Sequence, residues 1–415
     1  MTNRSSTKYI YFAFIWHGFF LALTVSMLDL NTVFPFLIDE LTSSKLVFAG
    51  LYSVMLGVPL IFNVIFSHHL KKKEYKKKYL LLGIYIRGTA FLGMAIFTYF
   101  FSVDYPTLTI LSFYFFVFMF SISAGFAGLS YSDIIAKLLK SDKRVSLYTF
   151  KQLFGSSAAF MGGIIIKYIF SQNISFPLNY TISLSIGFFG LFIASLGFLF
   201  LKEPPSVVNH DNNDSLMTYI KKIPEVLKKD SSFKLFIIVE NLAGFSIMIL
   251  PFYIFFAKYK WDIDDSYVGT YLIVLVVGTI FSNLIWGAIG KRFNAKAIVR
   301  FCIMLGGLNP LIAMYLGTTS PELFAIVFFI IGFTISGRKI GFEPYLLDII
   351  PTKERVEYLG IRGSLNVLVI ILPLLAAGAI EVFGYNFTFI GVSVMMATAF
   401  ILLGKISNKQ IEDMC

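Results

Sequence analysis

The chain has 415 residues, of which 57% are hydrophobic and only 14% are charged, and its formal net charge is +11 at pH 7. A soluble domain carries roughly 25% charged residues, so this composition excludes an ordinary soluble fold. The 2 cysteines are too few for a disulfide framework or a thiolate metal site, and we expect neither a metal nor a cofactor.

The apolar residues occur in repeated runs of roughly 20 or more, the length that crosses about 30 Å of hydrocarbon as a helix. These runs lack the alternating polarity of a membrane β-strand, so they predict helices. We therefore predict an all-α membrane protein with twelve transmembrane helices, over residues 9–38, 46–67, 79–101, 107–136, 146–170, 178–201, 233–257, 266–290, 296–317, 322–349, 357–382 and 385–405.

Positive charges crowd alternate connections between these spans. Lys and Arg follow the second, fourth, sixth, eighth and tenth spans and flank both ends of the chain, whereas the other connections hold mostly Asp and Glu. By the positive-inside rule, both termini lie in the cytoplasm. This placement explains the net charge without a nucleic-acid partner and predicts a multi-pass protein of the cell membrane, in contact with the lipid bilayer.

One long polar interval divides the chain. It covers residues 202–232 and includes a segment, 215–229, that predicts a short amphipathic helix on the membrane surface. The predicted organisation is an N-terminal six-helix bundle (1–201), a cytoplasmic linker (202–232) and a C-terminal six-helix bundle (233–415). Matching residue types recur across the two halves at a nearly constant offset, which indicates an internal repeat and two pseudo-symmetric bundles: Pro35 with Pro251, Asp133 with Asp348, Arg144 with Arg355, and Lys151 with Arg362.

These features together resemble the major facilitator superfamily. The family has a motif, Gly-x-x-x-Asp-Arg-x-Gly-Arg-Lys, after its second and eighth helices. Here the second copy reads GAIGKRFNAK, in which Gly287, Arg292 and Lys296 fit, whereas Lys291 replaces the acid and Asn294 replaces a glycine. The first copy has decayed to SHHLKKKEYKKK, and the subfamily is not identified.

The resemblance implies alternating access, with the first, fourth, seventh and tenth helices around a central cavity. It also implies a latch that closes the cytoplasmic side through ion pairs that make and break as the bundles move. The alternative is that these residues anchor helix ends at the interface. The candidate latch residues are Asp133, Arg144, Arg292, Asp348 and Arg355.

The span 322–349 holds three charged residues, and each ionisable group in hydrocarbon costs about 3 kcal/mol or more unless it has a partner or a watery cavity. Lys339 and Glu343 are four residues apart, so they share a face and can pair, which leaves Arg338 over. We predict that Arg338 or Lys339 contacts an anionic group of a substrate, while Glu343 carries a proton or neutralises its neighbour. The alternative is a structural salt bridge.

Two more acids lie inside predicted spans. Asp29, in the first span, is interpreted as a proton carrier, as a counter-charge for the tenth helix, or as the cap of a helix broken near Pro35. Glu240, in the seventh span, is a candidate for proton coupling, and Asn241 beside it is a candidate substrate contact.

Three more basic residues lie near the inner ends of predicted spans. His17 is expected to be packed and hydrogen-bonded. The repeat mates Lys151 and Arg362 are expected either to extend to the interface or to attract anions at an inner vestibule.

The chain has no nucleophile elbow, phosphate-binding loop or metal-spaced His/Cys set, so an enzyme is not expected. The favoured function is secondary active transport of a small anionic or zwitterionic organic substrate, with protons as the coupling ion and a monomer as the working unit. One alternative is an exporter of amphipathic, cationic drugs. Another is a transporter-like receptor or lipid-moving protein that does not cycle.

Overall fold

A computed structural model describes residues 6–71, 73–139, 141–172, 174–205, 216–264, 266–351 and 355–406. Contacts divide the chain into two compact units. The first unit comprises Met1–Asn212 with Asp264–Ile273, and the second comprises Asn213–Ile263 with Val274–Cys415. Each unit is described by itself.

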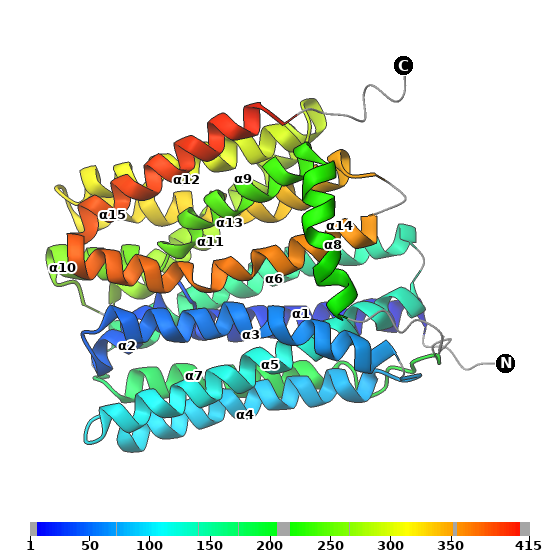
Figure 1. The fold of residues 1–415 in the computed structure, drawn as a ribbon. Helices are drawn as coiled ribbons and strands as arrows, with labels where there is room; N and C mark the ends of the chain where they lie inside the picture. The colour runs from blue at the N-terminus through cyan, green and yellow to red at the C-terminus, as the bar shows by residue number, and fades with distance from the viewer. Residues whose placement is uncertain are drawn as a thin grey trace. The chain divides into compact units, whose positions relative to one another are not determined.

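The first unit is a bundle in which α4 lies between α5 and α7, α1 packs against α6 and α7, and α3 packs against α5 (Figure 1). Its helices are α1 (Thr7–Met27), α2 (Val33–Leu41), α3 (Lys45–Lys71), α4 (Lys77–Phe101), α5 (Pro106–Leu138), α6 (Ser141–Ser171) and α7 (Leu178–Leu196).

The second unit is a bundle in which α12 packs against α13 and α15, and α9 packs against α15 and α13. Its helices are α8 (Leu216–Lys229), α9 (Ser231–Met248), α10 (Phe252–Trp261), α11 (Ser266–Arg292, whose first turns belong to the first unit), α12 (Ala295–Leu316), α13 (Pro321–Ile349), α14 (Arg355–Leu365), the 3-10 helix η2 (Asn366–Ile370) and α15 (Leu372–Gly404). The helix α8 occupies the amphipathic segment predicted at 215–229.

The starts of several helices follow from local sequence. The side chains of Asp230, Asn294 and Ser320 each accept a hydrogen bond from the backbone N–H three residues later, which satisfies a donor that the first turn leaves free. Pro106 and Pro321 stand in the first turns of α5 and α13, where the missing N–H costs nothing.

The first membrane pass of each half is broken. The helix α1 ends at Met27 and α2 begins at Val33, while α9 ends at Met248 and α10 begins at Phe252. The matched prolines Pro35 and Pro251 lie in the first turn of α2 and directly before α10, respectively. The two halves therefore share a structural break as well as a sequence pattern.

Eleven helices within the described residues are long and apolar enough to cross a membrane. One of them, α15, is interrupted at Gly384, whose φ of 80° is a left-handed conformation that glycine adopts without strain. Division of α15 at this point gives twelve passes. The all-α fold with two six-helix halves, predicted from the sequence, is confirmed.

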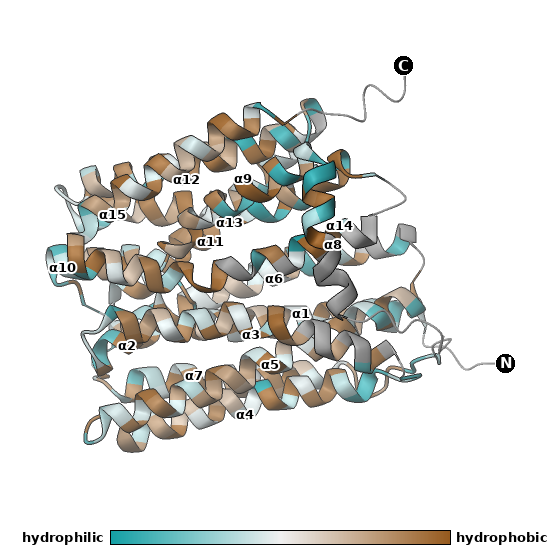
Figure 2. Ribbon diagram, in the orientation of Figure 1, coloured by the Kyte–Doolittle hydropathy of each residue, from teal (hydrophilic) through white to brown (hydrophobic). Residues whose placement is uncertain are grey.

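Hydrophobic residues run along the helices, and hydrophilic residues gather at helix ends and connections (Figure 2). Many large apolar side chains are open to the surroundings, including Phe200 at 78% and Leu284 at 72% exposure. Water would make such a surface aggregate, whereas lipid solvates it. The chain is an integral, multi-pass membrane protein.

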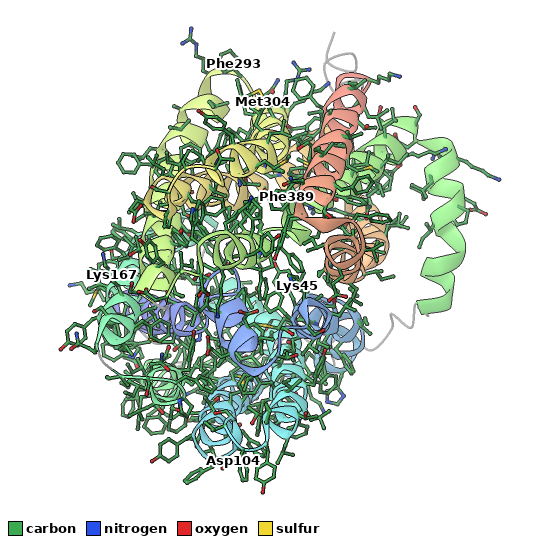
Figure 3. The ribbon with its side chains drawn as sticks, turned by 90° about the vertical axis from the view of Figure 1, so that its left-hand side faces the viewer. Lys45, Asp104, Lys167, Phe293, Met304 and Phe389 are labelled. Carbon is green, nitrogen blue, oxygen red and sulfur yellow. The ribbon has the colours of Figure 1, made fainter. Side chains whose placement is uncertain are left out.

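An aromatic cluster in the second unit joins α10 to the last part of α15. The ring of Phe389 lies 5.2 Å from those of Tyr253 and Phe256 and 6.0 Å from that of Tyr385, measured between centroids (Figure 3). Aromatic pairs at this spacing favour tilted and edge-on packing. The cluster fixes the second piece of the broken seventh pass against the twelfth.

Candidate functional site

A buried carboxylate lies at the centre of the second unit. Glu240, on α9, has a side chain only 2% exposed, and it accepts two parallel hydrogen bonds from Arg362 of α14. The distances are 2.6 Å from Nη2 to Oε1 and 2.9 Å from Nε to Oε2. This bidentate geometry is the strong form of an arginine–carboxylate pair, so the Arg362 guanidinium neutralises the Glu240 carboxylate.

A second guanidinium group adjoins the same residue. The Nη2 of Arg338, on α13, donates to the backbone carbonyl of Glu240 over 3.3 Å, and its guanidinium lies 4.7 Å from the centre of the Phe342 ring. Among the described residues, no carboxylate lies within ion-pair distance of Arg338. Two guanidinium groups therefore adjoin Glu240, Arg362 at its carboxylate and Arg338 at its backbone carbonyl, and Glu343 is a second acid close enough to act on Arg362.

Two amides border this cluster. The Nδ2 of Asn366 donates to Oε2 of Glu240 over 3.4 Å, and that of Asn241 donates to the Ile237 carbonyl over 2.9 Å. The Oδ1 atoms of both asparagines are buried and accept no hydrogen bond from the described part of the chain. Asn366 was not predicted from the sequence, although it follows Arg362 by four residues, a spacing that places the two on one helix face.

The structure separates the three charges predicted to act together on α13. Lys339 and Glu343 are both exposed, and no ion pair joins them in the described residues, so the structure does not show the pairing that their spacing allows. Arg338 is the one that turns toward Glu240. Arg338 points away from Lys339 and Glu343 because successive residues are about 100° apart around a helix, whereas residues four apart share a face.

Asp29 lies in the break between α1 and α2. Its Oδ1 accepts from the backbone N–H of Asn31 and from the hydroxyl of Thr32, both at 2.9 Å, and its carbonyl accepts from Phe34 N at 2.9 Å. This is an Asx-type turn, in which the side chain replaces a backbone acceptor. Asp29 therefore holds the turn between α1 and α2, whereas the N-cap of α2 is Thr32, whose side chain makes no capping hydrogen bond; the roles of Asp29 as helix cap, proton carrier and counter-charge stay predictions.

The hydrogen bonds that Asp29 accepts predict how a substitution at this position changes the stability of the protein. In D29A the N–H of Asn31 and the Thr32 hydroxyl lose their acceptor, so we expect a loss of about 1–2 kcal/mol in the free energy of unfolding. In D29N an amide oxygen takes the same place, so thermal unfolding of the purified protein should stay close to wild type. Normal stability of D29N combined with lost proton coupling would show that the charge, rather than these hydrogen bonds, matters.

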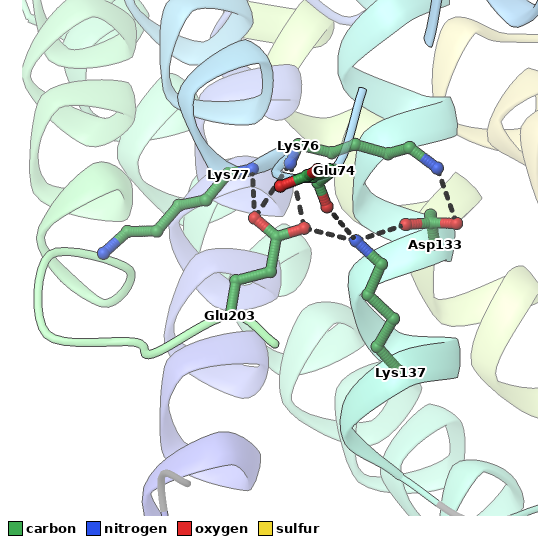
Figure 4. Close-up of polar contacts among 6 residues, drawn as sticks. All are labelled: Glu74, Lys76, Lys77, Asp133, Lys137 and Glu203. Carbon is green, nitrogen blue, oxygen red and sulfur yellow. Dashed lines mark hydrogen bonds and ion pairs between the residues drawn. The ribbon is translucent and has the colours of Figure 1, made fainter. Parts of the chain in front are cut away.

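The predicted latch residue Asp133 is engaged within the first unit. It forms ion pairs with Lys76 at 2.8 Å and with Lys137 at 2.9 Å (Figure 4). The side chains of its predicted neighbour Arg144 and of Arg355 lie outside the described residues. Arg292 is exposed and packs over the ring of Phe293 at 5.6 Å, and Asp348 is exposed. The latch stays a prediction.

Glu203 joins the same network and was missed by the sequence analysis. Its side chain is 2% exposed, and it accepts from Lys137 Nζ at 2.6 Å and from the backbone N–H groups of Lys76 and Lys77 at 2.9 and 2.7 Å (Figure 4). Anionic groups are stabilised at helix N-termini by free N–H donors and the helix dipole. Glu203 thus caps α4 from a distant point in the chain.

Comparison with known proteins supports the fold. Residues 235–412 match the sequence model of the Major Facilitator Superfamily. No curated protein sequence matches the chain. A crystal structure of a variant of the nucleoside transporter NupG aligns with a TM-score of 0.73 and 16% identity, over 95% of this chain and 99% of that one.

Two more solved structures are similar to a comparable degree. The D-xylose–proton symporter aligns with a TM-score of 0.69 and 13% identity, over 97% of this chain and 98% of that one. A bacterial homologue of the iron transporter ferroportin, in an inward-facing state, gives 0.68 and 12%, over 96% and 99%.

The helical architecture is that of a multi-pass membrane protein, and its fold is similar to those of solved transporters. Residues 235–412 match the sequence model of the Major Facilitator Superfamily, and the fold over the whole length is similar to that of solved transporters. The identities with solved structures are all low, so these structures establish the fold and leave the subfamily unspecified.

Proposed function

We propose that this protein is a secondary active transporter that moves a small organic anion or zwitterion by alternating access, coupled to protons. The observation that carries this proposal is the guanidinium of Arg338, which adjoins a carboxylate already occupied by Arg362. An unneutralised guanidinium in a membrane protein is costly, and a carboxylate or phosphate group of a substrate is the partner that its geometry fits.

Glu240 provides a route for proton coupling. Its ionised carboxylate neutralises Arg362, and protonation removes that charge, so both guanidinium groups then need an anion. Proton binding at Glu240 and anion binding at Arg338 therefore favour each other, and linkage requires the effect to be reciprocal. Asn241 and Asn366 supply uncommitted amide oxygens beside the cluster for a polar part of the same substrate.

The cation-exporter alternative depends on free acids, and the two acids on which it was based are both engaged. Asp29 accepts hydrogen bonds within its own turn, and Glu240 is held by Arg362. Among the similar folds, the D-xylose–proton symporter is by its name a proton-coupled carrier of a small polar solute. That precedent supports the coupling ion proposed here.

We propose the cell membrane as the location and the cytoplasm as the position of both termini, because Lys and Arg gather on the connections that share that side. The proposed working unit is a monomer. The latch residues Asp133, Arg144, Arg292, Asp348 and Arg355 are proposed to act when the cytoplasmic side closes.

Reconstitution into proteoliposomes tests the proposal. With an inward proton gradient, we expect uptake of a member of a panel of radiolabelled carboxylates and organic phosphates. The variant R338Q should reduce that uptake about tenfold or more, since one charge-assisted hydrogen bond contributes roughly 1.5–3 kcal/mol.

The adjacent Lys339 provides the matched control. K339Q also removes one positive charge from α13, but from an exposed side chain without an ion pair in the described residues, so uptake should stay near wild type. Equal uptake by R338Q and wild type would overturn the role of Arg338. Uptake of cations alone would support the exporter, and absence of flux for every solute would support the receptor.

A further inference from the structure

Lys151, on α6 of the first unit, is a partly buried cation that lies against α1. Its stem crosses Gly18, where an added Cβ would lie only 2.7 Å from Lys151 Cγ, so the glycine makes room for the lysine. Its Nζ lies 4.4 Å from the centre of the Tyr131 ring. No carboxylate of the described residues lies within ion-pair distance of this ammonium group.

The internal repeat shows which partner a cation at this position can have. Lys151 corresponds to Arg362, and each meets the first helix of its own unit at a similar level. Gly18 lies 9 residues before the end of α1 (27 − 18 = 9), and Glu240 lies 8 residues before the end of α9 (248 − 240 = 8). In the second unit the cation finds a carboxylate there, whereas in the first unit it finds a glycine and a histidine.

Two buried polar side chains next to Lys151 are also without partners. The hydroxyl of Tyr131, on α5, and both ring nitrogens of His17, on α1, are buried and make no hydrogen bond within the described part of the chain. The rings of Tyr131 and His17 lie 5.6 Å apart, and His17 is only 3% exposed. Each unmet buried donor costs about 1–3 kcal/mol.

The nearest acid on α5 is already committed. Asp133 stands two residues after Tyr131 in sequence, and it is held by Lys76 and Lys137. The π face of Tyr131 stabilises the Lys151 ammonium by only about 0.5–2 kcal/mol, which is less than an ion pair with matched hydrogen bonds supplies. The site therefore has excess positive charge and hydrogen-bond donors from three helices, and no anionic acceptor of the described residues faces it.

We propose that Lys151, Tyr131 and His17 form an oxyanion-binding site within the first unit, for a carboxylate or phosphate group. Lys151 provides the charge, and the Tyr131 hydroxyl and one His17 N–H provide hydrogen bonds. Because Lys151 is only partly buried, its ammonium group is reachable from outside the unit, and the other two groups lie deeper. This site is separate from Arg338 and stands whether or not Arg338 binds substrate.

Thermal unfolding of the purified full-length protein, with succinate or inorganic phosphate added against chloride at equal ionic strength, tests the site. The measurement uses the R338Q background, which removes the anion contact proposed for the second unit. We expect the anion to raise the Tm, since a ligand that binds only the folded state stabilises it. K151Q should weaken the apparent affinity about tenfold or more.

Three variants separate binding from general damage. Y131F removes one donor and keeps the ring beneath Lys151, so it should weaken binding less than K151Q does. G18V should displace the lysine stem without changing charge, and K234Q, at an exposed lysine of α9, should leave the response intact. An equal Tm response in R338Q and in R338Q/K151Q would overturn the site, as would no response to either anion in the R338Q protein. If K151Q is too unstable, Y131F and G18V decide the matter.

Discussion

Replacement of Glu240 by glutamine should both destabilise the protein and abolish transport driven by a proton gradient. The substitution leaves Arg362 without its bidentate partner and leaves Arg338 beside a neutral residue, in a site where the carboxylate is 2% exposed. Removal of one member of a buried ion pair costs about 3–5 kcal/mol, because the remaining charge is uncompensated. Thermal unfolding and proton-driven uptake in proteoliposomes measure the two effects.

The paired variant distinguishes charge imbalance from loss of shape. E240Q/R362Q removes both charges, so it should recover part of the stability that E240Q loses, although it should not recover proton coupling. E381Q is the matched control, since Glu381 is an exposed acid of α15 with no ion pair in the described residues, and its effect should stay within about 0.5 kcal/mol. An E240Q protein as stable as wild type, with coupled uptake intact, would contradict both the energetic and the functional role.

The helical plan was predictable because it depends on signals that repeat along the chain. Runs of apolar residues predict the passes, and the matched Pro35 and Pro251 predict that both first passes deviate from a straight helix. The structure breaks these passes at residues 28–32 and 249–251. The sequence does not state that Asp29 holds the first break, since a short polar side chain can cap a turn or carry a proton.

The charges of the site were found, but not their partners. Lys339 and Glu343 have the spacing of a helical ion pair, yet each is exposed and they do not pair. Glu240 instead meets Arg362, which is 122 residues away. An ion pair between residues four apart on one helix stabilises that helix by only about 0.2–0.5 kcal/mol. Contacts between helices therefore decide which pairs form.

The first unit also contains one ion pair that the sequence spacing predicts and others that join distant segments. Lys137 follows Asp133 by four residues, and these two residues form an ion pair. The spacing in the sequence was therefore enough to predict this contact. Glu203 carries no such pattern, because its partners Lys76, Lys77 and Lys137 lie 127, 126 and 66 residues earlier in the chain. Interaction of distant segments is a property of the folded bundle, and a single sequence without aligned relatives gives no sign of it.

Replacement of Glu203 by alanine should be the most damaging single change in the first unit. Glu203 ties the segment after α7 to the start of α4, where it accepts from two backbone N–H groups and from Lys137. In E203A these donors lose their acceptor, and α4 loses the anion at its N-terminus. We expect a loss of about 3 kcal/mol in the free energy of unfolding, since Lys137 retains its ion pair with Asp133.

Two further variants serve as comparisons for the stability of E203A. E203Q keeps an oxygen that can accept from the N–H groups but removes the charge, so its stability should lie between those of wild type and E203A. E74Q alters a nearby acid whose side chain is exposed, and it should change stability by no more than about 0.5 kcal/mol. If thermal unfolding of the purified protein ranks E203A with E74Q, then the network in Figure 4 contributes nothing to stability. If E203Q matches E203A, the charge rather than the hydrogen-bond acceptor holds α4 to the segment that follows α7.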